Sequence, residues 1–587
     1  MTPVRATLLD ISLPRTLDAW VDELLRQGRT GEQVEGWLFE GLEARRAAER
    51  RLQEAGIAAR LRSAYKPLVH HFLEQVDIEG LARVAVHHPM HPAAESRRFA
   101  LEAYPLVDLI GGAELSMQPK TCSDALPAYE IELLWRDGRR HTDTVLAPNR
   151  LHVDHLGQTL LSPTAWLHGA RRESDLEALF RMAMECLHRH PWPDAEPCFE
   201  RLDIRVDMPG IAFAPRFESG WINSHEALHE DLYFSLLEMF QLRSGRPAGD
   251  RRLQPGQIVP DVRASDGPVR LRIALAPQSR ARAEPRSRNG MASMPSLPLS
   301  EAAAPLAPEH IAVAVDGIAG DRFEARSLQG RRIRGVYHRG AGPAVLITGG
   351  QHANETSGVV GALRAAQALV QRPDAHFALI PLENPDGYAL HRALCARAPR
   401  HMHHAARYTA LGDDLEFRET PPWHERDARR QALALSGARL HLNLHGYPAH
   451  EWTRPMTGYI PRGFGLWTIP KGFFLIVRHH AGWAAQARAL AEQVCRALAA
   501  LPALMAFNAA QRASYNAHAG ELPFEVIHGT ACMIGEVDRP DSPALTLITE
   551  FPDETIYGDP FILAHDTQTA TVLAAVDAMG LIASPNP

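Results

Sequence analysis

The stretch AVLITGGQHANETSG, from Ala344 to Gly358, decides how the C-terminal half of this chain is interpreted. Its apolar beginning, Ala344 to Thr348, predicts a buried strand, and the glycines that follow predict a turn. A helical pattern then runs from Val359 to Val370. Strand, turn and helix in this order are typical of α/β proteins, whose binding sites lie beyond the carboxyl ends of the parallel strands. The turn is therefore the first place to look for chemistry.

The same pattern recurs along the rest of the C-terminal half. Strand-like runs alternate there with a long amphipathic helical stretch, Trp483 to Ala500; the strands are His376 to Pro381, Leu440 to Leu444 and Leu545 to Thr549. Such alternation predicts an α/β/α domain with a mixed, mostly parallel sheet. We assign this domain to residues 309–587.

The preceding segment, residues 278–308, is rich in Pro, Ser, Ala and Arg and lacks periodicity, which is typical of a linker. We place the domain boundary there. Residues 1–277 are interpreted as a mixed α/β accessory domain of unknown role. We expect helices in it at Leu17 to Leu25, Glu32 to Leu61 and Ser224 to Phe240, and strands at Tyr129 to Trp135 and Leu202 to Val206.

The composition is that of an ordinary globular protein. Of 587 residues, 45% are hydrophobic, and 62 basic against 69 acidic residues give a formal net charge of −7. A nucleic-acid-binding surface normally needs a basic excess, so no nucleic-acid partner is expected. The six cysteines form no CxxC pair, and we find neither a secretory signal nor an apolar run long enough for a membrane span. We therefore expect a cytoplasmic protein without a membrane partner; a homo-oligomer stays open.

Three residues in this half have the identity and placement of zinc ligands. His352 and Glu355 lie in the turn after the first strand, and His445 ends the strand-like run Leu440 to Leu444. Two histidines and a glutamate are the three-ligand set of a catalytic zinc, with a fourth position left for water. Glu550, at the end of another strand, is placed to move protons as a general acid/base. The sequence thus predicts one zinc ion per chain.

The order of these motifs resembles that of the zinc carboxypeptidases. HANE (His352 to Glu355), NPDGY (Asn384 to Tyr388), His445-Gly446-Tyr447 and Glu550 occur in the order found in that family, over roughly residues 309–587. The resemblance implies that His352, Glu355 and His445 bind zinc and that Glu550 is the general acid/base. It also implies that Tyr447 lines a substrate subsite.

A related branch, the aspartoacylases and succinylglutamate desuccinylases, is similar in other features. His445 follows Glu355 by 90 residues, and Arg407-Tyr408 followed by Asp414-Leu415 resembles the RY…DL segment of that branch. There the arginine polarises the scissile carbonyl. The resemblance therefore implies Arg407 for this role, with Arg400 as the second candidate.

The sequence departs from both branches where a substrate carboxylate would be clamped. Glu416 and Phe417 occupy the places where Asn-Arg is usual. We consider Arg418, Arg454 and Arg392 as replacements for the missing arginine. Alternatively, the Glu416 carboxylate binds an ammonium group of the substrate.

Two other histidine-rich motifs compete with this assignment. Ser224 to His229 reads SHEALH, and HExxH on a helix can bind zinc. However, His229 is followed by Glu230 and Asp231, and Asn223 or Ser224 is a good helix N-cap. We therefore favour a capped structural helix. The run His401-Met402-His403-His404 is interpreted as the beginning of a helix at the mouth of the site.

The leading functional hypothesis is a metallocarboxypeptidase-like peptidase that hydrolyses amide bonds. The second is a small-molecule deacylase of the desuccinylase type, so the expected substrate is a peptide or an N-acyl amino acid. The third is a non-catalytic zinc-fold binding module, against which the presence of Glu550 argues.

Overall fold

The computed structural model describes residues 6–123, 126–214, 220–278, 298–539 and 541–582. The chain forms two compact units. The first unit comprises Met1–Pro277 together with the segments His450–Pro470 and Ala513–Leu522, and the second comprises Gln278–Ala449, Lys471–Arg512 and Pro523–Pro587. Two segments that the sequence placed in the catalytic half therefore fold with the N-terminal half.

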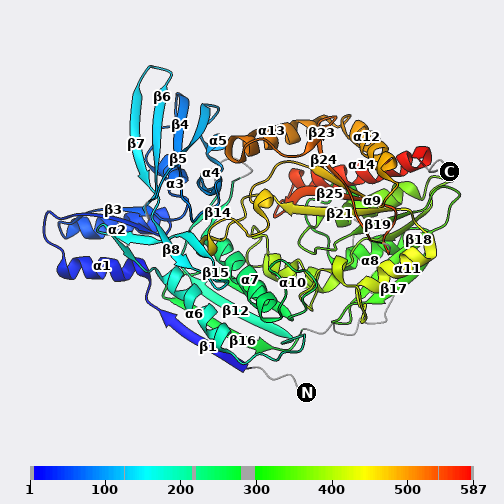
Figure 1. Ribbon diagram of the computed structural model, residues 1–587, viewed down its shortest axis with the longest axis horizontal. Helices are drawn as coiled ribbons and strands as arrows, with labels where there is room; N and C mark the ends of the chain where they lie inside the picture. Colours follow the sequence, from blue (N-terminus) through cyan, green and yellow to red (C-terminus); the bar gives the residue numbers. More distant parts are fainter. Residues whose placement is uncertain (1–5, 124–125, 215–219, 279–297, 540, 583–587) are drawn as a thin grey trace. The chain divides into compact units, whose positions relative to one another are not determined.

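The second unit is built on one nine-stranded sheet (Figure 1). Its strands, in spatial order, are β17 (Asp321–Arg326), β18 (Arg332–His338), β20 (Phe377–Ile380), β19 (Val345–Gly349), β21 (Leu440–Pro448), β25 (Leu545–Glu554), β22 (Phe474–His479), β24 (Thr530–Glu536) and β23 (Glu525–Ile527). The neighbours β20, β19, β21 and β25 run parallel, as do β22 and β24. The other pairs are antiparallel, so antiparallel pairs are as frequent as parallel ones. The predicted mixed α/β fold is confirmed.

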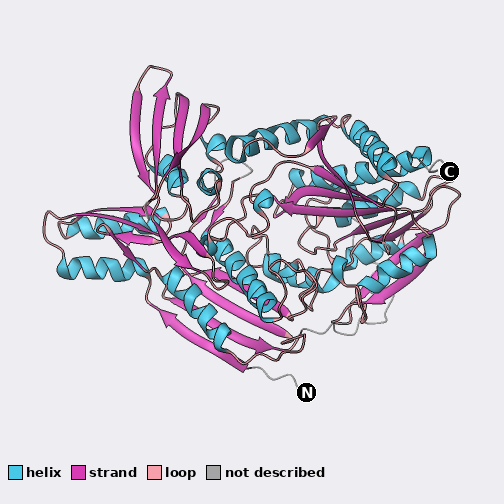
Figure 2. Ribbon diagram, in the orientation of Figure 1, coloured by secondary structure: helices cyan, strands magenta, loops and turns pink. Residues whose placement is uncertain are grey.

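Helices cover both faces of this sheet (Figures 1 and 2). On one face, α9 (Ser357–Leu369), α12 (Ala484–Leu498) and α14 (Asp559–Ile582) pack against β19, β21, β22 and β25. On the other face, α11 (Arg426–Ser436) packs against β17, β18 and β20. The two corresponding hydrophobic cores include Leu363 and Leu490 on the first face and Ala428 and Ala432 on the second. Further helices of the C-terminal half are α8 (Pro308–Asp316), α10 (Pro385–Cys395) and α13 (Pro502–Ala519).

The end of the predicted linker belongs to the core of the second unit. Residues 279–297 lie outside the described residues. Ala302 and Leu306, however, are buried in the core on the α9 side, next to a short 3-10 helix, Leu299–Glu301. The packed structure of the second unit thus begins before residue 309.

The first unit contains three four-stranded sheets. The first consists, in spatial order, of β1 (Ala6–Leu13), β16 (Val269–Ala276), β12 (Arg201–Met208) and β15 (Gln257–Ala264). The second consists of β11 (Ala170–Arg172), β10 (Ala165–Leu167), β2 (Gln33–Leu38) and β3 (Ala58–Ser63). The third consists of β5 (Glu114–Thr121), β4 (Leu81–Met90), β6 (Ala128–Trp135) and β7 (Arg140–Leu146). Two hairpins are added by β8 (Asn149–Val153) with β9 (Thr159–Pro163) and β13 (Ala212–Phe213) with β14 (Ile222–Asn223). Its helices include α1 (Thr16–Gln27), α2 (Leu42–Glu54), α3 (Pro67–Glu74), α4 (Arg98–Glu102), α5 (Leu106–Leu109), α6 (Asp175–Arg189) and α7 (Ser224–Arg243).

One helix predicted in this unit is wrong. The stretch Glu32 to Leu61 was expected to be a single helix, but it contains β2, α2 and most of β3. The parallel pairing of β2 with β3 over six residue pairs decides the structure there, because the pairing buries Val34 and Leu61 in a common core. Tertiary contacts override the helix propensity of the Ala, Leu, Glu and Arg residues. The other predicted elements of this unit are confirmed.

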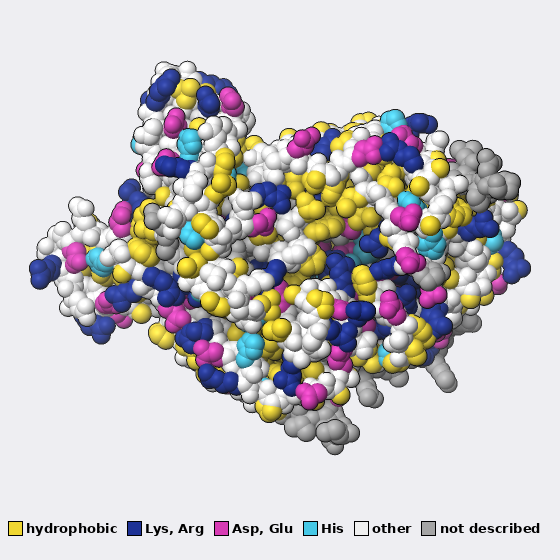
Figure 3. Space-filling model, in the orientation of Figure 1, with side chains coloured by type: hydrophobic (Ala, Val, Ile, Leu, Met, Phe, Trp, Pro, Cys, Tyr) yellow, Lys and Arg dark blue, Asp and Glu magenta, His cyan; other side chains and the backbone are white. Residues whose placement is uncertain are grey.

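Basic and acidic side chains are interspersed over the face of the molecule shown in Figure 3. In the described part of the chain, no single helix is both long enough and apolar enough to cross a membrane; only α12 and α13 taken together, as a bent pair, meet that criterion.

Candidate metal centre

The three predicted zinc ligands lie together in the second unit. Nδ1 of His352 is 2.8 Å from Oε1 of Glu355, and Nδ1 of His445 is 2.8 Å from its Oε2. The two Nδ1 atoms are 3.1 Å apart. Within the described residues, this is the only group of three or more His, Cys, Asp or Glu whose donor atoms all lie within 4.8 Å of one another. The donor types fit a zinc ion.

Glycines shape the turn that carries two of these residues. Gly350 has a φ of +61°, a conformation that residues with a Cβ rarely adopt. A Cβ on Gly358, in the first turn of α9, would lie 2.7 Å from the carbonyl oxygen of Leu444. Glycine at this position therefore lets α9 approach β21 beside His445. The sequence pattern Gly-Gly…Gly around the HANE motif serves this close packing.

Charges around the site favour a cation. Burial raises the pKa of Glu355, but His352, Arg407 and His445 outweigh it and hold that pKa well below its ordinary value. Burial and Arg407 lower the pKa of His352, whereas Glu355 and Asp414 outweigh them and raise it. Burial lowers the pKa of His445. The site thus holds an ionised carboxylate between two histidines, and the same charges that favour a proton on His352 would favour a zinc ion, which takes the place of that proton when it binds.

Asp414 supports His352 from behind, a role that sequence analysis did not assign. Its Oδ2 lies 3.2 Å from Nε2 of His352, the ring nitrogen that faces away from Glu355. Its Oδ1 accepts a hydrogen bond of 3.0 Å from the Gln351 amide. Carboxylates in this position commonly orient histidine ligands of metals. The RY…DL segment contains Asp414 and could have drawn attention to this residue. The sequence did not show that His352 is its partner.

Glu550 lies beside His445 on the neighbouring strand β25; because β21 continues to Pro448 and β25 to Glu554, the two residues lie within these strands and not at their predicted ends. The two residues are paired in register across the parallel strands β21 and β25, so their side chains project from the same face of the sheet. Burial, followed by the Glu355 carboxylate, raises the pKa of Glu550 well above its ordinary value. Lys471, which no motif singled out, acts in the opposite direction on Glu550. Burial lowers the pKa of Lys471 itself to about 7.

The two candidate arginines occupy different environments. Arg407 donates a hydrogen bond of 2.7 Å to Oε1 of Glu355, and its side chain is largely buried. Arg400 is exposed in a turn of the chain. The structure thus brings Arg407, but not Arg400, into contact with a ligand candidate.

Two residues predicted to bind substrate are engaged in ion pairs. Arg418 is buried and donates to Asp413 (2.6 and 2.9 Å) and to Glu425 (2.6 Å). Glu416 accepts hydrogen bonds from Arg429 and Arg539. Each has protein partners that satisfy its charge, so neither presents an unpaired group to a ligand.

Tyr447 and Arg454 are also committed to contacts within the protein. The Tyr447 hydroxyl donates to the Gly472 carbonyl oxygen (2.7 Å) and accepts from the Lys471 amide (3.0 Å). Arg454 belongs to the first unit, where it is buried and forms a bidentate pair with Glu238 on α7 at 2.6 and 3.0 Å. Arg392, the further candidate, is exposed and donates to the Leu306 carbonyl oxygen (3.2 Å).

The HExxH motif lies at the beginning of α7 and binds the protein itself. The Asn223 side chain caps the helix by accepting from the amides of His225 and Glu226 (2.8 and 3.0 Å), as expected. The His225 ring contacts the Met208 carbonyl oxygen at 3.0 Å, and Glu226 binds His450 at 2.7 Å. The structural helix is confirmed.

The acidic residues after the motif bind the segment His450–Pro470. Asp231 accepts hydrogen bonds from the Met456 amide and the Thr457 hydroxyl, both at 2.6 Å. Glu238 binds Arg454, as described above. The charges on α7 that weakened the zinc interpretation therefore hold this segment in the first unit.

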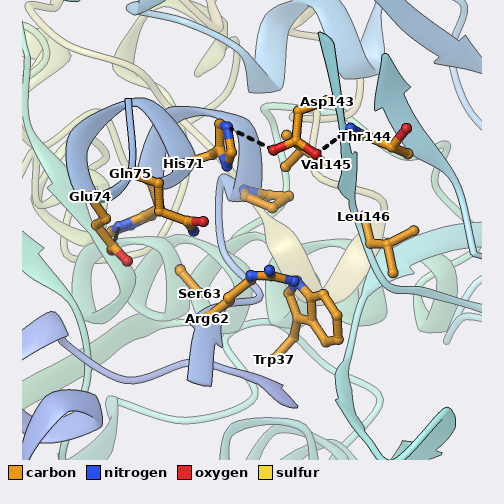
Figure 4. A pocket seen from close by; sticks show the side chains of 12 residues that line it. Trp37, Arg62, Ser63, His71, Glu74, Gln75, Asp143, Thr144, Val145 and Leu146 are labelled. Atoms are coloured by element: carbon orange, nitrogen blue, oxygen red, sulfur yellow. Dashed lines mark hydrogen bonds and ion pairs between the residues drawn. The ribbon is translucent and has the colours of Figure 1, made fainter. Parts of the chain in front are cut away.

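In the part of the chain that the structure describes, the remaining histidine clusters form no ligand group of this kind. His403 precedes a short 3-10 helix, His404–Ala406, of which His404 is the first residue, so the run does not begin a longer helix. Figure 4 shows a small pocket of the first unit, where Arg62 lies over the Trp37 ring and His71 is 3.6 Å from Asp143. None of the residues predicted for the active site lines this pocket.

Comparisons with known proteins agree with the motifs. A search of curated proteins finds no match. Among solved structures, a metallo-carboxypeptidase from Burkholderia cenocepacia is 14% identical with a TM-score of 0.29, over 53% of this chain and 76% of that one. A succinylglutamate desuccinylase/aspartoacylase from Rhodobacter sphaeroides is 15% identical with a TM-score of 0.24, over 45% and 69% of the two chains. Residues 313–428, which include His352, Glu355 and Arg407, match the zinc carboxypeptidase family, and the predicted resemblance to that family is confirmed.

Proposed function

We propose that this protein is a zinc-dependent hydrolase of amide bonds, of the metallocarboxypeptidase type. The observation that carries the proposal is the convergence of His352, Glu355 and His445 beside Glu550. The match of residues 313–428 to the zinc carboxypeptidase family supports it. We assign the three converging residues to one zinc ion per chain.

In this proposal each residue has a separate chemical task. Zinc held by His352, Glu355 and His445 supplies a Lewis acid that polarises the scissile carbonyl and activates water. Glu550 takes a proton from the attacking water and passes it to the leaving amine, so that water and amide become acid and amine. Arg407 stabilises the negative charge that develops on the carbonyl oxygen. Asp414 holds the His352 ring in its ligating orientation.

The substrate is a peptide or an N-acyl amino acid. The long segment between His445 and Glu550 and the NPDGY motif favour a peptidase, whereas the RY…DL segment favours a deacylase. Because Arg418 and Glu416 already pair with charged residues, we infer that a terminal-carboxylate clamp at these positions is not part of recognition.

A panel of short peptides and N-acyl amino acids, assayed with the zinc-loaded protein, separates the two substrate classes. Hydrolysis of peptides alone supports the peptidase, and hydrolysis of N-acyl amino acids alone supports the deacylase. If the intact protein hydrolyses neither class, the hydrolase proposal is wrong and the non-catalytic binding module becomes the better explanation.

The role of Glu550 is tested by Glu550→Gln, which keeps the shape of the side chain and removes its basicity. We expect kcat to fall by at least about two orders of magnitude, a typical effect of losing a general base. Zinc content should stay at the wild-type level, because Glu550 is not a ligand in this proposal. Near-normal turnover in this variant would contradict the mechanism.

A further inference from the structure

Glu554 is a buried carboxylate for which neither the fold nor the proposed mechanism yet supplies a purpose. It is the last residue of β25, four residues after Glu550, and only 1% of its surface is exposed. Within the described part of the chain, neither of its carboxylate oxygens accepts a hydrogen bond. Leaving a buried charged group without hydrogen bonds is costly, so such a group calls for an explanation.

Two basic side chains lie near this carboxylate. Nε2 of His404 lies 3.5 Å from Oε2 of Glu554, and a guanidinium nitrogen of Arg407 lies 3.9 Å from its Oε1. The same nitrogen of Arg407 donates to Oε1 of Glu355 at 2.7 Å. Arg407 therefore stands between two carboxylates, hydrogen-bonded to one and just outside hydrogen-bond distance of the other.

The bond between Arg407 and Glu355 competes with the function assigned to Glu355. Oε1 of Glu355 is also 2.8 Å from His352, and its Oε2 is 2.8 Å from His445 and 3.1 Å from the Gly446 amide. When Glu355 acts as a metal ligand, its lone pairs are directed to the ion and are less available to a guanidinium. Arg407 then needs another anionic partner to stay in place.

Among the described residues, the carboxylates that interact electrostatically with Arg407 are Glu355, Glu554, Asp414 and Glu550. Glu550 is assigned to proton transfer in the proposed mechanism, so it is not counted as a fixed partner of the arginine. Asp414 already binds His352 through one oxygen and Gln351 through the other. Glu355 is a ligand candidate. Glu554 is thus the one that can receive Arg407.

On this basis, and resting on the proposed function, we propose that Glu554 is a positioning residue that holds Arg407 in its catalytic orientation while Glu355 binds the metal. It acts through Arg407 and contacts neither substrate nor metal. The proposal explains both why a carboxylate is buried at the end of β25 and why it accepts no hydrogen bond when Arg407 is bound to Glu355.

The test is a double-mutant cycle of Glu554→Gln and Arg407→Met in the full-length, zinc-loaded protein. We expect Glu554→Gln to lower kcat at least about 10-fold with a smaller change in KM, because Arg407 acts on charge that develops in the transition state. In the Arg407→Met background the same substitution should change kcat less than about 2-fold, since the residue it positions is gone. Additive effects on kcat would overturn the proposal.

Two further variants separate this role from simple support of the fold. Glu554→Asp keeps the charge and should recover part of the lost kcat. Glu425→Gln removes another buried carboxylate that binds an arginine, Arg418, away from the site. It should lower thermal stability and leave kcat unchanged; a similar kcat loss in Glu425→Gln would show that Glu554 is merely structural.

Measuring zinc affinity tests the proposal even if the protein hydrolyses neither substrate class. Without Glu554, Arg407 stays on Glu355 and competes with the ion, so we expect zinc affinity in chelator competition to fall about 10-fold or more. Arg407→Met should restore that affinity in the double variant. If no substrate is hydrolysed but these zinc affinities follow the expected order, the proposed function fails and the role of Glu554 stands. If Glu554→Gln binds zinc as the wild type does, the competition between Arg407 and the metal is refuted.

Discussion

The chain contains two short His/Glu motifs whose spacing is compatible with zinc binding, and the structure brings donor atoms together at one of the two. In the second unit, His352 and Glu355 meet His445 with all three donor atoms within 4.8 Å. In the first unit, His225 contacts the Met208 carbonyl oxygen, and Glu226 binds His450. The comparison shows that the spacing of two residues predicts a zinc site only weakly unless another element supplies a third ligand.

The difference follows from where each motif lies in its fold. The HANE turn comes at the end of the parallel strand β19, and the neighbouring strand β21 carries His445 directly after its last residue paired with β19. Carboxyl ends of parallel strands gather side chains from distant parts of a chain. The HExxH motif instead begins a helix that is buried from Ser224 to Gln241, so its polar groups must find protein partners. They find them in the segment His450–Pro470.

The largest expected effect is on metal content, measured by elemental analysis of the wild type, His445→Ala and His225→Ala. We expect His445→Ala to lose the bound zinc, because a catalytic zinc site with two protein ligands left binds weakly. His225→Ala should retain it. Loss of zinc in His225→Ala alone would reverse the comparison and move the chemistry to α7.

The next largest effect is on the stability of the first unit, through Arg454. Its buried pair with Glu238 predicts that Arg454→Met leaves an uncompensated charge and costs about 3–5 kcal/mol in the free energy of unfolding. Denaturant unfolding measures this cost. The matched control is Arg205→Met, which removes an exposed partner of Asp207 and should cost less than about 1 kcal/mol.

Arg454→Met also distinguishes the two roles considered for Arg454, which are binding of a substrate carboxylate and a structural ion pair with Glu238. A substrate-clamping arginine would raise KM and leave stability unchanged when replaced. If Arg454→Met unfolds like the wild type and only KM rises, the assignment of this residue to the interior of the first unit is wrong.

Sequence analysis located the strands of the second unit because each carries its own signal. β19, β21 and β25 begin with apolar runs that lead to Gly349, His445 and Glu550, so the positions of the strands and of these residues could be predicted, although β21 and β25 extend beyond them. β3 (Ala58–Ser63) has the sequence AARLRS, without a β-branched or aromatic residue. Its strand conformation depends on pairing with β2, a contact that no local pattern reveals.

The substrate residues were harder to predict, for a related reason. An arginine in a sequence is equally suited to bind a ligand or a carboxylate of the protein. Arg418 has both Asp413 and Glu425 within hydrogen-bond distance, and Arg454 finds Glu238, a residue more than two hundred positions away in the chain. Only the fold decides which carboxylate each arginine meets. The ligand set was predictable because its members lie next to apolar runs that predict strands. The residues of the charge pairs are not associated with any such sequence pattern.

The smallest expected effect is on zinc affinity and concerns Asp414, the carboxylate that binds His352. Asp414 binds the far nitrogen of His352 at 3.2 Å, whereas the His225 ring in the first unit contacts the backbone carbonyl oxygen of Met208. Asp414→Asn keeps the size of the side chain and weakens its hold on the imidazole, so zinc affinity should fall about 10- to 100-fold. Chelator competition measures it, with Asp316→Asn, an exposed partner of Arg334, as the control that should bind zinc normally. A zinc affinity unchanged by Asp414→Asn would mean that the three ligands alone orient one another, and that the carboxylate behind His352 serves the fold.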